Sequence, residues 1–299
     1  MAHDHAHHAP ASFSRAFAAG AALNVAFVAV EATVGLRAHS LALLADAGHN
    51  LTDVLGLLLA WGAAWLAGLA PTARRTYGWR RSSILAALAN ALLLLVAVGG
   101  IAWEAVRRLG APEPVASGAL VWVAALGVAV NTATALLFMR GRADDLNVRG
   151  AFLHMAADAG VSLGVGAAGL VIGTTGWLWL DPAVSLAIAA VITAGTWGLL
   201  RESVDLALDA VPEGIDPAEV RAFLATQPGV AGVHDLHVWA MSTTEAALTA
   251  HVVRPEAGTD DAFLHDAVHA LHERFGIDHA TIQVERGTAE CHLEPETVV

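Results

Sequence analysis

The chain of 299 residues is 56% hydrophobic and only 15% charged, and its mean hydropathy is +0.56. Soluble proteins carry about 25% charged residues, so the composition excludes an ordinary soluble protein and predicts a membrane protein. The net charge of −12 argues against a nucleic-acid partner, because phosphate binding requires a basic surface. The single cysteine, Cys291, rules out an internal disulfide.

The chain begins with a polar segment of twelve residues that contains His3, His5, His7 and His8. This segment lacks the basic start and the apolar core of a cleaved signal peptide. We interpret residues 1–12 as a His-rich cytoplasmic N-terminus. Two roles stay open for it, a collector of metal ions and a disordered terminus without function.

Six apolar runs follow, each about twenty residues long, and a run of that length can cross a bilayer as a helix. They lie at residues 13–36, 41–69, 83–106, 117–139, 149–173 and 181–200. Asp181 and Pro182 are predicted to be the N-cap and the first helical residue of the last run. The pattern predicts an α-helical membrane protein with a six-helix transmembrane bundle over residues 13–208.

Arginine supplies every positive side chain, and its distribution between the loops is uneven. If successive loops alternate between the two sides of the membrane, nine arginines fall on the side of the N-terminus and three on the other. Loops rich in Arg stay in the cytoplasm. We therefore expect a multi-pass protein whose N- and C-termini are both cytoplasmic.

Residues 209–299 differ in composition from the apolar part of the chain. From Glu213 onward fifteen acidic side chains stand against four arginines, a net charge of −11, which predicts a water-soluble domain. The predicted elements are a helix at 216–226, strands at 230–240 and 245–254, a helix at 260–275 and a strand at 280–285. This αββαβ order predicts a small α+β domain with two helices for one face of a sheet.

Two of the apolar runs contain the same pair of ionisable residues. His49 and Asp53 are four residues apart in the second run, and His154 and Asp158 have the same spacing and order in the fifth. Residues four apart share one face of a helix. A charged side chain at mid-bilayer costs about 2.5–3.5 kcal/mol, so these groups should face the interior of the bundle.

Two helices that each offer an imidazole and a carboxylate can form a tetrahedral site of the kind that zinc accepts. A lone histidine would more often make a hydrogen bond between helices. Four ionisable groups together need a compensating charge, and a metal ion supplies it. The sequence thus predicts a metal site of His49, Asp53, His154 and Asp158. Polar residues predicted to line the cavity around it are Asn24, Glu31, Asp46, Asn50 and Asn90.

These motifs resemble the cation diffusion facilitator family, and especially its zinc-transporting members. The matching stretches are SLALLADAGHNLTD at 40–53, TYGWRR at 76–81, NVRGAFLHMAAD at 147–158, Asp181-Pro182, HDLHVW at 234–239 and TIQVE at 281–285. The resemblance covers nearly the whole chain. It implies a zinc efflux transporter rather than an enzyme, a metal–proton antiporter that works as a homodimer, here in a bacterial inner membrane.

The resemblance also implies that residues 209–299 form a ferredoxin-like cytoplasmic domain that binds additional metal. It points to His234, His251 and Glu285 as the ligands, with His237 and His279 as alternatives. In the membrane site, an imidazole at position 49 implies zinc, since members that move manganese or iron carry aspartate there. Cadmium and cobalt stay open as further substrates, because affinity alone separates such metals poorly.

Two other groups of metal-binding residue types lie in the C-terminal part. His265, His269 and His272 share one face of a predicted helix, and we interpret them as a solvent-exposed face. Cys291 and His292 have two interpretations, a thiolate–imidazole pair and part of a frayed tail.

The predicted mechanism follows from the chemistry of the ligands. Neutral imidazole and ionised carboxylate bind metal and their protonated forms do not, so protons entering from the far side should displace zinc that entered from the cytoplasm. An intramembrane metalloenzyme would need an open metal position and a general base, as in HExxH, and the sequence has no HExxH. A membrane metal sensor that signals through its cytoplasmic domain is the alternative, and it would bind zinc without moving it.

Overall fold

A computed structural model describes the backbone of residues 11–138, 146–256, 261–288 and 291–293. Within these ranges it leaves out the side chains of residues 11–21, 53, 56–57, 60–61, 64, 137–138, 146–151 and 154. The predicted His-rich segment, with His3 to His8, lies outside the described residues. The chain divides into two compact units, one of Met1–Leu58 with Asn90–Gly198 and one of Leu59–Ala89 with Leu199–Val299. Each unit is described by itself.

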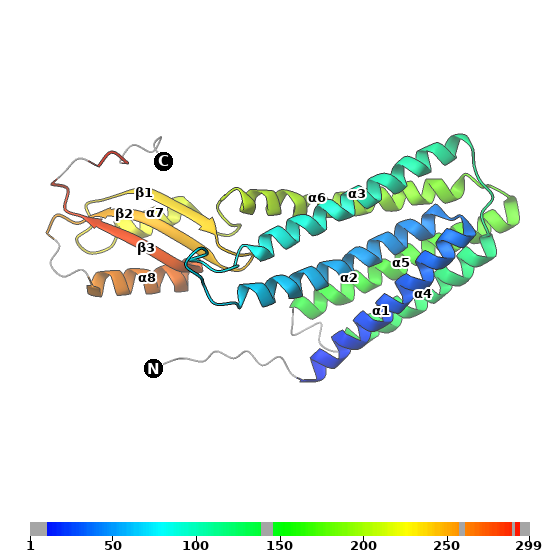
Figure 1. Ribbon diagram of the computed structural model, residues 1–299, viewed down its shortest axis with the longest axis horizontal. Coiled ribbons are helices and arrows are strands. Elements are labelled where there is room, and N and C mark those ends of the chain that lie inside the picture. The colour runs from blue at the N-terminus through cyan, green and yellow to red at the C-terminus, as the bar shows by residue number, and fades with distance from the viewer. Residues whose placement is uncertain (1–10, 139–145, 257–260, 289–290, 294–299) are drawn as a thin grey trace. The chain divides into compact units, whose positions relative to one another are not determined.

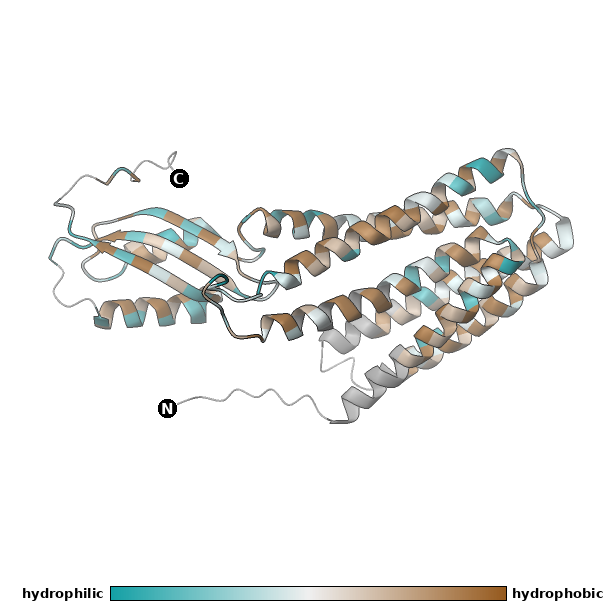
Figure 2. Ribbon diagram, in the orientation of Figure 1, coloured by the Kyte–Doolittle hydropathy of each residue, from teal (hydrophilic) through white to brown (hydrophobic). Residues whose placement is uncertain are grey.

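Six long helices come first in the chain (Figure 1). They are α1 (Ala11–Ala38), α2 (Leu41–Ala67), α3 (Ser82–Gly110), α4 (Ser117–Phe138), α5 (Leu146–Thr175) and α6 (Leu180–Ala207). Within the described residues, stretches of α3, α4, α5 and α6 are long and apolar enough to cross a membrane, and Figure 2 shows apolar residues along most of α3. The protein therefore has at least four candidate membrane spans, and the count of six stays a prediction.

The start of α2 corrects the predicted role of Asp181. Its buried carboxylate accepts hydrogen bonds from the hydroxyl of Ser40 at 2.5 Å and from the backbone N–H groups of Leu41 at 2.9 Å and Ala42 at 3.3 Å. The carboxylate therefore satisfies the free N–H groups of α2, while α6 begins one residue earlier, at Leu180. The predicted N-cap role of Asp181 is wrong because it rests on the neighbouring Pro182 alone. The actual hydrogen-bond partners of Asp181 lie at the start of α2, 140 residues earlier in the chain.

Small residues bring α4 and α5 close together in the first unit. A Cβ atom added at Gly169 would lie 3.0 Å from the Cβ of Leu120, and one at Gly127 would lie 2.7 Å from the hydroxyl of Ser162 and from the ring of Phe27. Such close approach is typical of helix pairs in membranes, where dispersion contacts rather than burial from water drive association. The α4–α5 contact therefore fixes the position of α5, which carries two of the predicted ligands.

The C-terminal part of the second unit is an αββαβ domain, as predicted. It comprises α7 (Pro217–Ala225), β1 (Gly232–Ala240), β2 (Ala246–Val253), α8 (Asp261–Phe275) and β3 (Ile277–Glu285). The sheet has the order β1-β2-β3, with β1 antiparallel and β3 parallel to β2. Both helices pack on one face through an apolar core that includes Leu224, Leu248 and Leu271. The opposite face of the sheet carries neither of these two helices.

The second unit also holds the ends of α2, α3 and α6. Ile84 of α3 and Leu206 of α6 pack against Ala240 at the end of β1. Two ion pairs lie nearby, Arg80 with Glu245 and Arg81 with Asp209. The arginines just before α3 are thus paired with acidic residues beyond α6 and between the strands.

The α4–α5 contact yields a prediction on packing. The change Gly127→Ala should lower the stability of the protein by about 1–3 kcal/mol, because its methyl group would overlap the buried ring of Phe27 and the hydroxyl of Ser162. The matched control is Gly164→Ala, whose Cβ would meet nothing within 4 Å and should leave stability unchanged or slightly higher. Thermal unfolding in detergent measures both, and equal melting curves would contradict the close contact.

Candidate functional site

The structure brings together two of the four predicted membrane ligands. The Nε2 atom of His49 in α2 lies 3.4 Å from the Oδ1 atom of Asp158 in α5. Asp158 is 2% exposed, so its carboxylate is almost completely removed from solvent. Asp53 and His154 lie one helical turn away on the same two helices, and their side chains are outside the described residues.

Three carboxylates are buried in this part of the first unit. Glu31 in α1 is 0% exposed and Asp46 in α2 is 1% exposed, compared with 2% for Asp158. Glu31 accepts a hydrogen bond from the amide of Asn50 at 3.3 Å, and Asp46 accepts one from the hydroxyl of Ser162 at 3.2 Å. Each of these two carboxylates has a second buried oxygen that no donor among the described side chains reaches. A cation or protons must compensate the charge that remains.

Among the described side chains, Asn24 and Asn90, which are also predicted to line the cavity, make no hydrogen bond to the three buried carboxylates. The amide of Asn24 donates to the sulfur of Met155 at 3.5 Å, and the amide oxygen of Asn90 is buried. Sequence reasoning missed Ser162, whose hydroxyl binds Asp46. A signal was present, because Ser162 follows Asp158 by four residues and therefore shares its helical face.

The ligands predicted for the C-terminal domain lie on the face of the sheet opposite to α7 and α8. His251 on β2 pairs in register with His234 on β1. Glu285 on β3 pairs with Val253, two residues after His251 on β2. Paired residues of neighbouring strands project to the same face, and side chains alternate along a strand. Since Ala250 belongs to the core beneath the helices, the neighbouring His251 projects away from it, together with His234 and Glu285.

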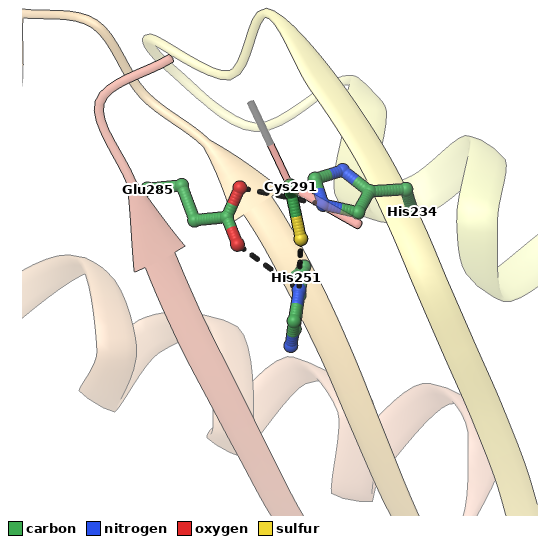
Figure 3. Close-up of side chains that lie close together, drawn as sticks. All are labelled: His234, His251, Glu285 and Cys291. Atoms are coloured by element: carbon green, nitrogen blue, oxygen red, sulfur yellow. Dashed lines mark hydrogen bonds and ion pairs between the residues drawn. The ribbon is translucent and has the colours of Figure 1, made fainter. Parts of the chain in front are cut away.

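These side chains converge on one point (Figure 3). Nδ1 of His251 lies 3.0 Å from Oε1 of Glu285, and Nε2 of His234 lies 3.3 Å from Oε2 of the same carboxylate. The sulfur of Cys291 lies 3.7 Å from Nδ1 of His251. One ligand atom from each of the four residues lies within 4.8 Å of all the others. Among the described residues, no other group of three or more His, Cys, Asp or Glu side chains comes together in this way.

Asp235 supports this group from a β-bulge in β1. The register of β1 shifts between His234 and His237, and Asp235 has a positive φ of 48°. Its carboxylate lies 2.8 Å from Nε2 of His237 and 3.4 Å from Nε2 of His251. With Nε2 held by a carboxylate, Nδ1 of His251 is the nitrogen that faces the cluster, and such an arrangement orients histidine ligands in metal sites.

The remaining histidines lie elsewhere in the domain. The ring of His279 contacts Tyr77 with a centroid separation of 5.6 Å, so it lies outside the cluster, and His237 faces Asp235. The predicted face of α8 is exposed, as expected, and His272 there approaches Asp278 at 3.5 Å. Sequence reasoning did not identify Asp235, and it left Cys291 undecided.

Comparison with known proteins shows the family. The family described as "Cation efflux transmembrane domain" matches residues 17–206, and the one described as "Cation efflux protein, cytoplasmic domain" matches residues 212–287. The chain belongs to the cation efflux family, and the resemblance to the cation diffusion facilitators is confirmed.

Relatives of known name cover almost the whole chain. The cation efflux system protein CzcD of Alcaligenes sp. is 37% identical over 97% of this chain and 92% of its own length. The zinc transporter ZitB of Escherichia coli is 37% identical over 98% of this chain and 96% of its own length. A cadmium, cobalt and zinc/H(+)-K(+) antiporter of Bacillus velezensis is 32% identical over 95% and 92%.

Solved structures are similar to parts of the chain, and one of them is a metal-bound domain. The metal-bound C-terminal domain of the CzcD transporter of Cupriavidus metallidurans is 40% identical and covers 24% of this chain and 99% of its own length, with a TM-score of 0.23.

The cluster of His234, His251, Glu285 and Cys291 yields a prediction on metal binding. The double change His234→Ala with His251→Ala should abolish one zinc-binding event of the purified full-length chain, because both nitrogen ligands of the cluster are lost. The double change His265→Ala with His269→Ala on the exposed face of α8 removes as many imidazoles and should leave that event intact. Isothermal titration calorimetry measures both, and equal loss in the two variants would contradict the assignment.

Proposed function

We propose that this chain is a zinc efflux transporter of a bacterial inner membrane that exchanges zinc for protons. Relatives named as a zinc transporter and as a metal–proton antiporter, at 37% and 32% identity over nearly the full length, support this function. Cadmium and cobalt, which stand in the name of the antiporter, are further candidate substrates.

The transport site in this proposal consists of His49, Asp53, His154 and Asp158. The observation that carries it is the 3.4 Å contact between His49 of α2 and Asp158 of α5 at a place where further carboxylates are buried. Two imidazoles and two carboxylates suit zinc, and the charge of a divalent ion offsets carboxylates that neither water nor lipid can solvate.

Proton exchange follows from the same ligands. A carboxylate or an imidazole that takes up a proton no longer binds metal, so zinc and protons compete for one site. In the proposed cycle, zinc enters from the cytoplasm, the helices rearrange to open the site to the far side, and protons displace the ion. Glu31 and Asp46, which are also buried carboxylates of this unit, are further candidates to take up these protons.

The proposed architecture is a six-helix bundle at 13–208, followed by a ferredoxin-like cytoplasmic domain at 209–299. Six long helices and the αββαβ order are consistent with it. Both termini, including the His-rich segment 1–12, lie in the cytoplasm in this proposal, as the arginine distribution favours. The family name ZT_dimer for the cytoplasmic domain supports a homodimer.

The cytoplasmic domain contributes an accessory metal site in this proposal, with His234, His251 and Glu285 as ligands. The residues present fit a metal ion, because the buried Nε2 of His234 makes an ion-pair contact of 3.3 Å with Glu285 but no hydrogen bond among the described residues. A metal ion would supply positive charge between the two imidazoles and the carboxylate. The protein holds the two imidazoles and the carboxylate on adjacent strands of the sheet.

Coupling to protons is tested in proteoliposomes that contain the wild-type chain. Zinc uptake should be driven by an acidic lumen and should acidify the outside, because each zinc ion that enters releases protons from the site. A fluorescent zinc indicator in the lumen and a pH dye outside measure the two fluxes. Zinc flux that ignores the pH gradient would contradict antiport, and zinc binding without any flux would favour the metal sensor.

The change His49→Asp tests metal selectivity. It replaces an imidazole with a carboxylate and should shift transport preference from zinc towards manganese, because oxygen ligands suit harder ions. The exposed His39 at the end of α1 provides the control, since His39→Asp makes the same change of charge outside the buried cluster. Competition uptake with zinc and manganese measures the preference, and an unaltered preference in His49→Asp would remove His49 from the ligand set.

A further inference from the structure

We propose that Cys291 is the fourth ligand of the cytoplasmic metal site, so that metal occupancy fastens the C-terminal tail to the sheet. This inference rests on the proposed site of His234, His251 and Glu285 and assigns the position that these three residues leave open. Zinc in proteins is most often held by four ligands when its role is structural, and a site with three protein ligands keeps a place for water or substrate.

The distances within the cluster suit one tetrahedral ion. With zinc–nitrogen bonds of about 2.0–2.1 Å and a zinc–sulfur bond of about 2.3 Å, neighbouring ligand atoms are separated by roughly 3.3–3.6 Å. The separations around His251 are 3.0 Å to Glu285 and 3.7 Å to Cys291, and His234 lies 3.3 Å from Glu285. The other pairs of ligand atoms lie within 4.8 Å of each other, so shifts of about one ångström would bring all four donors to the separations of a tetrahedral ion.

A buried imidazole gives independent support for an ion at this point. His234 is 8% exposed, and its Nε2 atom is buried without a hydrogen-bond partner among the described residues. Buried polar atoms in folded proteins are nearly always satisfied. Apart from its ion-pair contact with Glu285, this nitrogen has no hydrogen bond among the described residues, and it lies in the group that includes Cys291. A metal ion there would give it a direct bond.

The chain turns back after β3 in a way that allows Cys291 to reach the sheet. Gly287 has a positive φ of 67°, a conformation that favours glycine. A Cβ atom at this position would lie 3.3 Å from a methyl group of Val253 on β2. The turn therefore runs close to the strand, and the tail lines an open hollow of about 480 Å³ together with His251 and Glu285.

A thiolate changes what the site can do. On binding, the thiol gives its proton to water and the sulfur binds the ion, and soft thiolate ligands favour zinc and cadmium over magnesium, calcium and manganese. Four protein ligands close the coordination sphere, which suits an ion that is retained rather than passed on. A soft divalent ion from the cytoplasm would thus fasten the tail more firmly to the sheet.

Cobalt(II) in place of zinc tests the ligand directly in the purified full-length chain. Thiolate bound to cobalt gives a charge-transfer band in the near ultraviolet, and Cys291 is the chain's only cysteine, so the band reports this site alone. The band should appear in the wild type, vanish in Cys291→Ser and persist in the control His292→Ala. Cys291→Ser should also lose more affinity than the roughly 10–100-fold that a residue outside the ligand set contributes.

The outcomes separate this inference from the site on which it rests. If the wild type binds more cobalt than the His234→Ala/His251→Ala variant but shows no charge-transfer band, the cytoplasmic site stands and Cys291 is not a ligand. If the two bind equally, the cytoplasmic site itself is wrong and the inference falls with it. Alkylation of the wild type by iodoacetamide is a second measurement, and zinc should slow it at least tenfold, whereas an unchanged rate would overturn the inference.

Discussion

The first unit depends on the neutralisation of three carboxylates that are buried among apolar helices. Glu31, Asp46 and Asp158 are each no more than 2% exposed, and a charged group in the middle of a membrane costs about 2.5–3.5 kcal/mol even on insertion scales. Hydrogen bonds from Asn50 and Ser162 satisfy only some of the carboxylate oxygens. A cluster of this kind is stable only with positive charge inside it, which either a divalent ion or protons can supply. Exchange of one for the other is what the proposed antiport requires.

The rest of the first unit holds the residues around this charge in place. Asp181 ties the start of α2 to the start of α6 through hydrogen bonds to Ser40 and to backbone N–H groups, and glycines fix α5 against α4. The two helices that carry the proposed ligands are therefore each anchored by contacts other than those between the ligands. A metal site needs such support, because small displacements of the ligands weaken binding.

Much of the fold could be predicted from the sequence, because it follows from local patterns. Each of the six apolar runs became a helix that begins within three residues of the predicted start, and the αββαβ order was correct. Asp181 was assigned wrongly and Asp235 was missed, because their roles depend on contacts that spacing does not encode, with the distant α2 in one case and across a β-bulge in the other. Cys291 stayed undecided for the same reason, since only the folded tail brings it to His251.

Asp158 offers the most direct test of the central claim, that the buried cluster is the transport site. The change Asp158→Asn keeps the shape of the side chain but removes one negative charge and an anionic ligand. Radioactive zinc uptake into proteoliposomes should be abolished in this variant, while zinc binding that depends on His234 and His251 is retained. Uptake at the wild-type rate would contradict the claim and would place the transport pathway elsewhere in the chain.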